Sequence, residues 1–234
     1  MDLSMKETLY TIPISEVFEP KEGCPLCRLH GMLEERALEG IMGAAMMEPD
    51  IRIQTNKLGF CSDHFDRMLK RKNRLSLALM LESHLGELLK ALPDEKAVKS
   101  GKPDLRTVST AAKGCYVCTK VDDAMEMMFS NLFKIWSREQ AFQELYAAQP
   151  YLCLQHYTAL VEHAPKHLGK KELPEFLTVT TALTRAYLEK AKSDVSRFCS
   201  MFDYRNAGVD KDWGDSKTAV ERAIGYLTAR PPEV

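Results

Sequence analysis

A chain of 234 residues, of which 45% are hydrophobic and 28% charged, has the composition of a globular protein with one large or two small domains. The formal net charge of −1 gives no overall basic field that would favour nucleic acid or acidic membranes as partners. No signal peptide and no run of about 18 apolar residues is recognisable, which predicts a cytoplasmic protein without a membrane span. In that reducing compartment, paired cysteines more often bind metal than form disulfides.

The chain begins with an N-terminal arm, residues 1–22, which carries enough apolar side chains to dock against the rest of the protein. A first helical unit is expected over residues 23–92. Its apolar residues recur at the spacing of an amphipathic helix from Arg28 to Met47. A leucine-rich stretch from Leu75 to Leu92 predicts a second long helix that is largely buried.

Residues 93–112 contain two prolines, a glycine and many charges, which predicts a linker. Residues 113–203 repeat the helical plan as a second unit. Residues 204–234 form a C-terminal tail, with a final helix that begins at Asp215 or Ser216. Because period-two alternation is almost absent, the predicted fold class is all-α, with two pseudo-repeated helical units and a C-terminal helix.

One arrangement of cysteine and histidine occurs in both units. A Cys-x-x-Cys pair is followed, after 33 or 34 residues, by a Cys-x-x-His pair, and corresponding positions of the two copies are offset by 91 or 92. This regularity argues against ordinary buried core cysteines. The first copy consists of Cys24, Cys27, Cys61 and His64, and the second consists of Cys115, Cys118, Cys153 and His156.

Side chains three residues apart in a helical turn lie on the same side, so both members of each pair can reach one ion. Three thiolates and one imidazole are a standard tetrahedral ligand set for structural zinc. The order of the motifs predicts one Cys3His site per copy, and so two Zn²⁺ ions, each stabilising one helical unit. The alternative is an iron–sulfur cluster, because thiolates suit it too, although histidine favours zinc.

Charged, polar and aromatic residues gather near the C-terminus. The simplest interpretation is a network of salt bridges that docks the final helix. The alternative is a small-molecule or partner site in which the arginines and a lysine recognise an anion. The set comprises Asp203, Tyr204, Arg205, Asn206, Trp213, Lys217, Glu221 and Arg222.

The sequence resembles a bacterial family of unknown function. The resemblance is carried by the segments GCPLC, GFCSDH and FDYRN, the last followed by a tryptophan and AVERAI, and it extends over nearly the whole chain. It implies that the doubled cysteine–histidine motif and the segment Asp203–Asn206 are features of that family. It implies no known reaction.

These observations favour a non-enzymatic, zinc-binding helical protein that acts as a binding or adaptor module, because closed four-ligand sites leave no open position for water or substrate. The first alternative is an enzyme or small-molecule-binding protein that uses a groove near Asp203–Asn206 and Arg222. The second is an iron–sulfur redox protein. The sequence does not identify the partner, whether protein or small molecule, and no basic stripe with interleaved aromatic residues favours nucleic acid.

Overall fold

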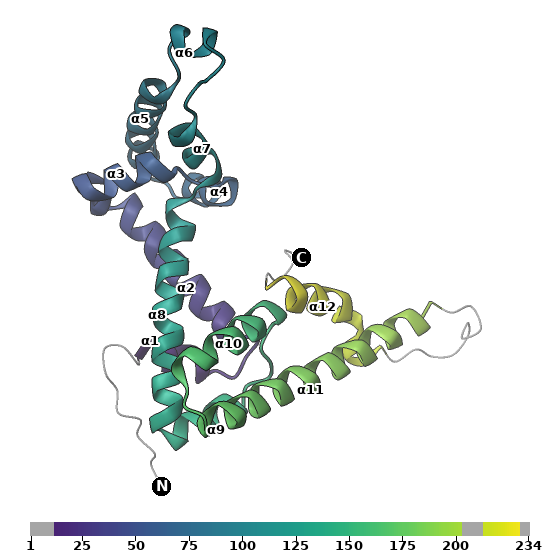
Figure 1. Cartoon of the computed structure of the whole chain (residues 1–234). Helices are drawn as coiled ribbons and strands as arrows, with labels where there is room; N and C mark the ends of the chain where they lie inside the picture. Colours follow the sequence, from purple (N-terminus) through teal and green to yellow (C-terminus); the bar gives the residue numbers. More distant parts are fainter. Residues whose placement is uncertain (1–11, 203–212, 230–234) are drawn as a thin grey trace. The chain divides into compact units, whose positions relative to one another are not determined.

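The computed structural model describes residues 12–202 and 213–229, and within these ranges the chain is built from helices without a strand (Figure 1). The all-α prediction is therefore confirmed. The chain divides into two compact units. The inserted unit comprises Gly31–Met125, and the terminal unit comprises the described parts of Met1–His30 and Glu126–Val234.

This division differs from the expected succession of one unit over 23–92 and another over 113–203. Its boundaries fall inside two helices, α2 (Pro25–Met42) and α8 (Tyr116–Arg138), and each helix contributes residues to both units. In the sequence, one unit is therefore nested within the other.

The terminal unit is organised along α11 (Glu172–Ser200), its longest helix. Four elements pack against α11, and Figure 1 shows two of them, α10 and α12, lying along it. These elements are α9 (Gln140–Ala147), α10 (Leu154–His167), η3 (Gly214–Thr218) and α12 (Ala219–Thr228). The unit also contains α1 (Ile12–Phe18), together with the first turns of α2 and the second half of α8.

Aromatic side chains form the core of the terminal unit. The ring centroids of Trp136, Tyr146 and Phe176 lie 5.0–5.5 Å apart, and all three side chains are buried. Phe18 stacks on Tyr146 from α1. The Tyr146 hydroxyl, which would be costly to bury unpaired, lies 2.9 Å from the Thr180 hydroxyl on α11. This core joins α8, α9 and α11.

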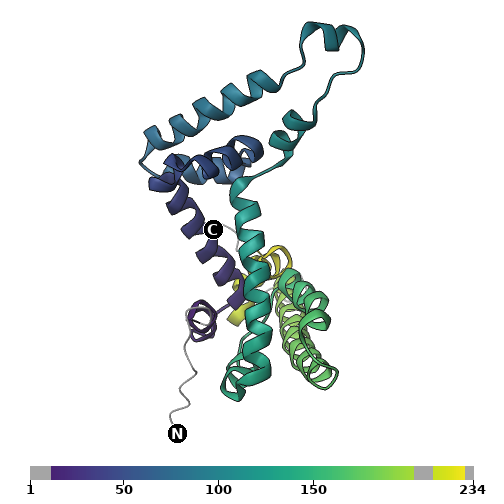
Figure 2. The ribbon, with the colours of Figure 1, turned by 60° about the vertical axis from the view of Figure 1, so that its left-hand side comes forward.

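In the inserted unit, α3 (Pro49–Leu58) packs against η1 (Ala44–Met47), α5 (Arg74–Ala91) and α7 (Arg106–Lys113), while α4 (Ser62–Lys70) packs against α5. In Figure 2, α5 is the long blue-teal helix in the upper part of the view, and it leads into the short helix α6 (Glu95–Lys99). The segment expected as a linker, 93–112, thus contains α6 and most of α7 and belongs to the inserted unit.

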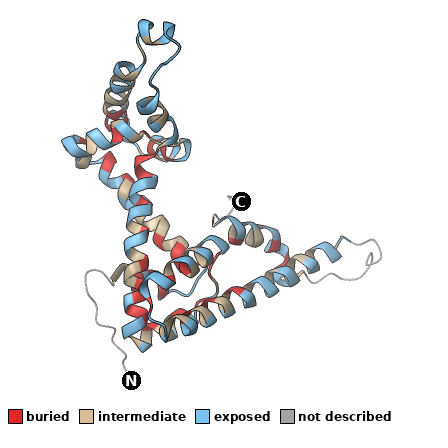
Figure 3. Cartoon of the chain, viewed as in Figure 1, coloured by how far each residue is buried: buried red, intermediate tan, exposed pale blue. Residues whose placement is uncertain are grey.

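Helix α5 departs from the sequence-based expectation. It was expected to be largely buried, but its buried residues are only Ser76, Leu77 and Met80. Leu75 and Leu89 are 70% and 71% exposed, and Figure 3 shows most of α5 as exposed or intermediate. The prediction was wrong because the helix is apolar on two faces, and only one of them packs against α3, α4 and α7.

Candidate metal centres

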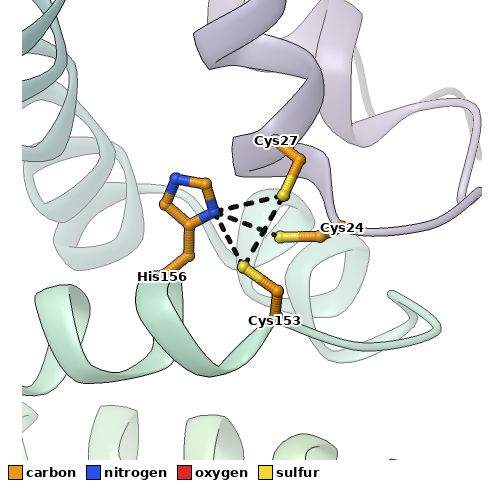
Figure 4. Close-up of side chains that lie close together, drawn as sticks. All are labelled: Cys24, Cys27, Cys153 and His156. Carbon is orange, nitrogen blue, oxygen red and sulfur yellow. Dashed lines mark hydrogen bonds between the residues drawn. The ribbon is translucent and has the colours of Figure 1, made fainter. Parts of the chain in front are cut away.

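Four predicted ligands meet in the terminal unit: Cys24, Cys27, Cys153 and His156 (Figure 4). Their ligand atoms all lie within 4.8 Å of one another. The His156 Nδ1 atom is 3.1 Å from the sulfur of Cys153, 3.4 Å from that of Cys27 and 3.6 Å from that of Cys24. The Cys27 and Cys153 sulfurs are 3.6 Å apart.

Local backbone structure places these four side chains. Cys24 directly precedes α2, and its carbonyl oxygen accepts the backbone N–H of Cys27, which forms the turn that aligns the two thiols. Cys153 is the N-cap residue of α10, and His156 is three residues later in the first turn. Side chains at these two positions of a helix start face each other, as they do in a capping box. The Cys-x-x-His spacing is therefore explained by a helix N-terminus.

The other four predicted ligands meet in the inserted unit: Cys61, His64, Cys115 and Cys118. The His64 Nδ1 atom lies 3.1 Å, 3.2 Å and 3.5 Å from the sulfurs of Cys61, Cys115 and Cys118, respectively. Cys61 is the N-cap residue of α4, so this pair is arranged like Cys153 and His156. The Cys61 and Cys118 sulfurs are 4.0 Å apart.

Two glycines bring the two ligand-bearing segments of the inserted unit together. Gly59 has a φ of +61°, a conformation that suits glycine, and its carbonyl oxygen accepts the backbone N–H of Tyr116 at 2.9 Å. A Cβ atom on Gly114 would lie 2.7 Å from the carbonyl oxygen of Leu58 and 2.8 Å from that of Thr110. The chain entering Cys115 thus lies directly against the chain entering Cys61.

The ligand sets correct the assignment suggested by the order of the motifs. Each Cys-x-x-Cys pair joins the Cys-x-x-His pair of the other copy, so Cys24 and Cys27 do not share a site with Cys61 and His64. The reason is the length of α2, which starts at Pro25. From Cys27 to its last residue, Met42, the helix rises about 22 Å. The next helix, α3, has only 10 residues and rises about 15 Å, too little to retrace that distance.

Both clusters have the dimensions of a single-metal site. With Zn–S bonds of about 2.3 Å and Zn–N bonds of about 2.0–2.1 Å, a tetrahedron has ligand–ligand edges of about 3.5–3.8 Å. The recorded sulfur–nitrogen and sulfur–sulfur distances are 3.1–4.0 Å. An iron–sulfur cluster distributes its ligands over several irons and spaces them more widely. The eight residues therefore fit one ion per cluster.

Protonation in the clusters also suits a cation. Burial raises the pKa of Cys115, but its contact with His64 lowers that pKa to about 6. Burial and the adjacent Cys115 sulfur raise the pKa of Cys118. Contact with Cys115 raises the pKa of His64 to about 9, and nearby thiols likewise raise the pKa of His156 to about 9 against the effect of its burial. Without a metal, the ligands of each cluster share protons among closely spaced thiols and an imidazole. A bound divalent ion would displace these protons.

A residue that the sequence did not reveal supports His64. The Glu34 carboxylate lies 2.8 Å from His64 Nε2, and Glu34 is also paired with Arg67. A carboxylate on the far nitrogen fixes the histidine ring and its tautomer, with Nδ1 directed toward the metal. The repeat gave no hint of this role, because an offset of 91 places Met125 opposite Glu34. Within the described part of the chain, His156 Nε2 has no such carboxylate.

The C-terminal polar set is only partly described, since Asp203, Tyr204, Arg205 and Asn206 lie outside the described residues. Its other members serve different contacts. Trp213 packs against Phe198 and Phe202, with centroids 5.7 Å apart in both pairs. Arg222 donates to Asp194 on α11 at 2.9 Å. Lys217 is exposed, and one buried oxygen of Glu221 has no hydrogen-bond partner among the described residues. The Arg222 contact fits the interpretation that salt bridges dock the final helix.

Fold and clusters together define a helical protein with two Cys3His groups that could each hold a metal ion. No described helix combines the length and apolarity needed to cross a membrane. The chain belongs to the family of unknown function DUF6062, which matches residues 5–234 and agrees with the resemblance noted from the motifs. Searches of curated proteins and of solved structures gave no match.

Proposed function

We propose that each Cys3His cluster binds one Zn²⁺ ion and that the protein is a zinc-stabilised helical scaffold acting as a non-enzymatic binding or adaptor module. The observation that carries this proposal is the closure of both clusters. Each presents three thiols and one imidazole nitrogen within 4.8 Å of one another, which completes a tetrahedron from protein atoms alone. A catalytic zinc instead keeps one position for water or substrate.

Zinc is favoured over an iron–sulfur cluster by the spacing of the ligand atoms and by the histidine in each set. In both clusters the histidine contributes Nδ1, and in the inserted unit its other nitrogen is held by Glu34. This arrangement is typical of a metal-bound histidine. Thiolate ligands also suit a reducing compartment, and we therefore place the protein in the cytoplasm.

The test is the metal content of the full chain purified without oxygen, measured by plasma mass spectrometry beside a visible absorption spectrum. We expect two zinc ions per chain and no colour. Iron together with sulfide and visible absorption would replace the zinc scaffold with a redox protein. Less than one metal per chain would refute metal binding by these clusters.

A further inference from the structure

Helix α5 carries two apolar faces on opposite sides. The face that contains Leu77 and Met80 packs inside the inserted unit. At 100° per residue, the second face forms a stripe about 100° wide, centred on the side of the helix away from the first. The stripe is apolar except at Glu82, and its leucines are 53–71% exposed; its members are Leu75, Ala78, Glu82, Leu85, Leu89 and, at the C-cap, Leu92.

The stripe has the spacing of a coiled-coil seam. Its positions are separated alternately by three and four residues, which is the a/d pattern of a heptad repeat. Gly86 lies beside the stripe in the middle of the helix, where glycine weakens helical structure. A Cβ atom there would meet nothing within 4 Å, so no contact with residues 12–202 or 213–229 requires this glycine. A second helix approaching closely would give the glycine a structural role.

We propose that α5 pairs with α5 of a second copy of this chain as an antiparallel two-helix seam. A two-fold axis between Ser83 and His84 would place Leu75 opposite Leu92, Ala78 opposite Leu89 and Glu82 opposite Leu85. In the same register, Gly86 faces Leu79. The two small residues, Ala78 and Gly86, thus meet leucines, which suits interdigitating side chains, while Leu75 packs on Leu92 and the Glu82 side chain lies beside Leu85.

Charge also favours a second copy in this orientation. The antiparallel register brings Arg74, which is exposed at the start of α5, to the end of the partner's α5, where the first residue of α6, Glu95, is exposed and pairs with Lys99 at 2.6 Å. A parallel pair would instead place Glu82 against Glu82 and Arg74 against Arg74, and like charges at such positions are destabilising. The surface is therefore complementary to itself in one direction, as a two-fold interface must be.

The contact is expected to be reversible. An 18-residue helix is about 27 Å long, so one pair of helices provides an interface at the small end of the range for stable dimers. We therefore expect a dissociation constant on the order of micromolar. The pairing does not depend on the identity of the bound metal.

The experiment is sedimentation equilibrium of the full chain up to about 100 µM, well above that dissociation constant. We expect a monomer–dimer equilibrium that the double substitution Leu85→Glu, Leu89→Glu shifts to monomer. Met47→Glu is the matched control, because Met47 and Leu89 are both 71% exposed in the same unit, and it should leave the equilibrium unchanged. Far-UV circular dichroism must match the wild type in each variant.

A charge exchange tests the register with substitutions at exposed sites. Arg74→Glu should weaken the dimer several-fold, and adding Glu95→Arg should restore it. A wild-type protein that stays monomeric at about 100 µM, or a dimer that survives the two leucine substitutions, would overturn the proposal. A dimer that the second charge substitution does not restore would overturn the antiparallel register.

Discussion

Replacing cysteines two at a time distinguishes the observed ligand sets from the sets suggested by motif order. Cys24→Ser combined with Cys153→Ser removes two ligands from one cluster, so one metal per chain should remain. Cys24→Ser combined with Cys61→Ser removes one ligand from each cluster, so both metals should be lost or greatly weakened. Sites formed within each motif copy would give the opposite pattern.

The effect should be large. Structural zinc contributes on the order of 10–16 kcal/mol at neutral pH, whereas a whole domain has a net stability of only about 5–15 kcal/mol. Losing one metal should therefore unfold the unit that holds it. The inserted unit is the more dependent of the two, because its buried side chains are mainly aliphatic, whereas the terminal unit also has the aromatic core around Trp136.

Tryptophan fluorescence separates the two events, because the chain's two tryptophans, Trp136 and Trp213, both belong to the terminal unit. Cys61→Ser alone should reduce the helical circular dichroism while leaving the Trp136 emission close to native. Cys153→Ser should change both signals. The observed ligand sets would be refuted if the Cys24→Ser, Cys153→Ser variant lost two metals and the Cys24→Ser, Cys61→Ser variant lost only one.

Two further predictions concern residues that support the inserted cluster. Glu34→Gln should keep the metal but accelerate its release to a chromogenic chelator about 10–100-fold, because His64 loses the carboxylate that holds its ring. The control is Glu35→Gln, which alters ion pairs with Arg67 and Arg71 but no contact of His64. Equal release rates in the two variants would contradict a positioning role for Glu34. Gly114→Ala should lower the melting temperature, because its Cβ atom would lie 2.7 Å from a backbone oxygen, whereas Gly40→Ala, with open space around it, should raise it slightly. An unchanged melting temperature for Gly114→Ala would show that the chain entering Cys115 need not approach the chain entering Cys61 so closely.

The sequence identified the ligands but not their grouping. Cys-x-x-Cys and Cys-x-x-His are local patterns, and the helix starts at Pro25, Ser62 and Leu154 follow from the same few residues. The grouping depends on the distance that α2 carries the chain, and a 3.6-residue period does not say where a helix of known length will end in space. Motif order was therefore a poor guide to which pairs would meet.

Contacts between distant segments account for the other differences. In the sequence, Glu34 cannot be distinguished from other glutamates on a helix surface. Its role depends on His64, which is 30 residues away in the sequence and is placed beside it by α4. Apolar periodicity correctly predicted a helix over α5 but could not say how many of its faces the chain would cover. Arg222 was recognised as a candidate for salt bridging, whereas its partner Asp194 is 28 residues away on another helix.

Because each cluster combines a Cys-x-x-Cys pair from one motif copy with a Cys-x-x-His pair from the other, the stability of one cluster depends on whether the other unit is folded. All four ligands of the inserted unit lie between Cys61 and Cys118, so that cluster can assemble from a contiguous stretch of chain. The terminal cluster must instead join Cys27 to Cys153 across the whole inserted unit. Closing an unfolded loop of about 95 residues costs on the order of 4 kcal/mol from the length term alone, and a folded inserted unit shortens that loop. Loss of the inserted metal should consequently lower the metal affinity of the terminal cluster without unfolding the aromatic core around Trp136. Loss of the terminal metal should leave the metal affinity of the inserted cluster unchanged, because the four ligands of that cluster lie within one stretch of chain.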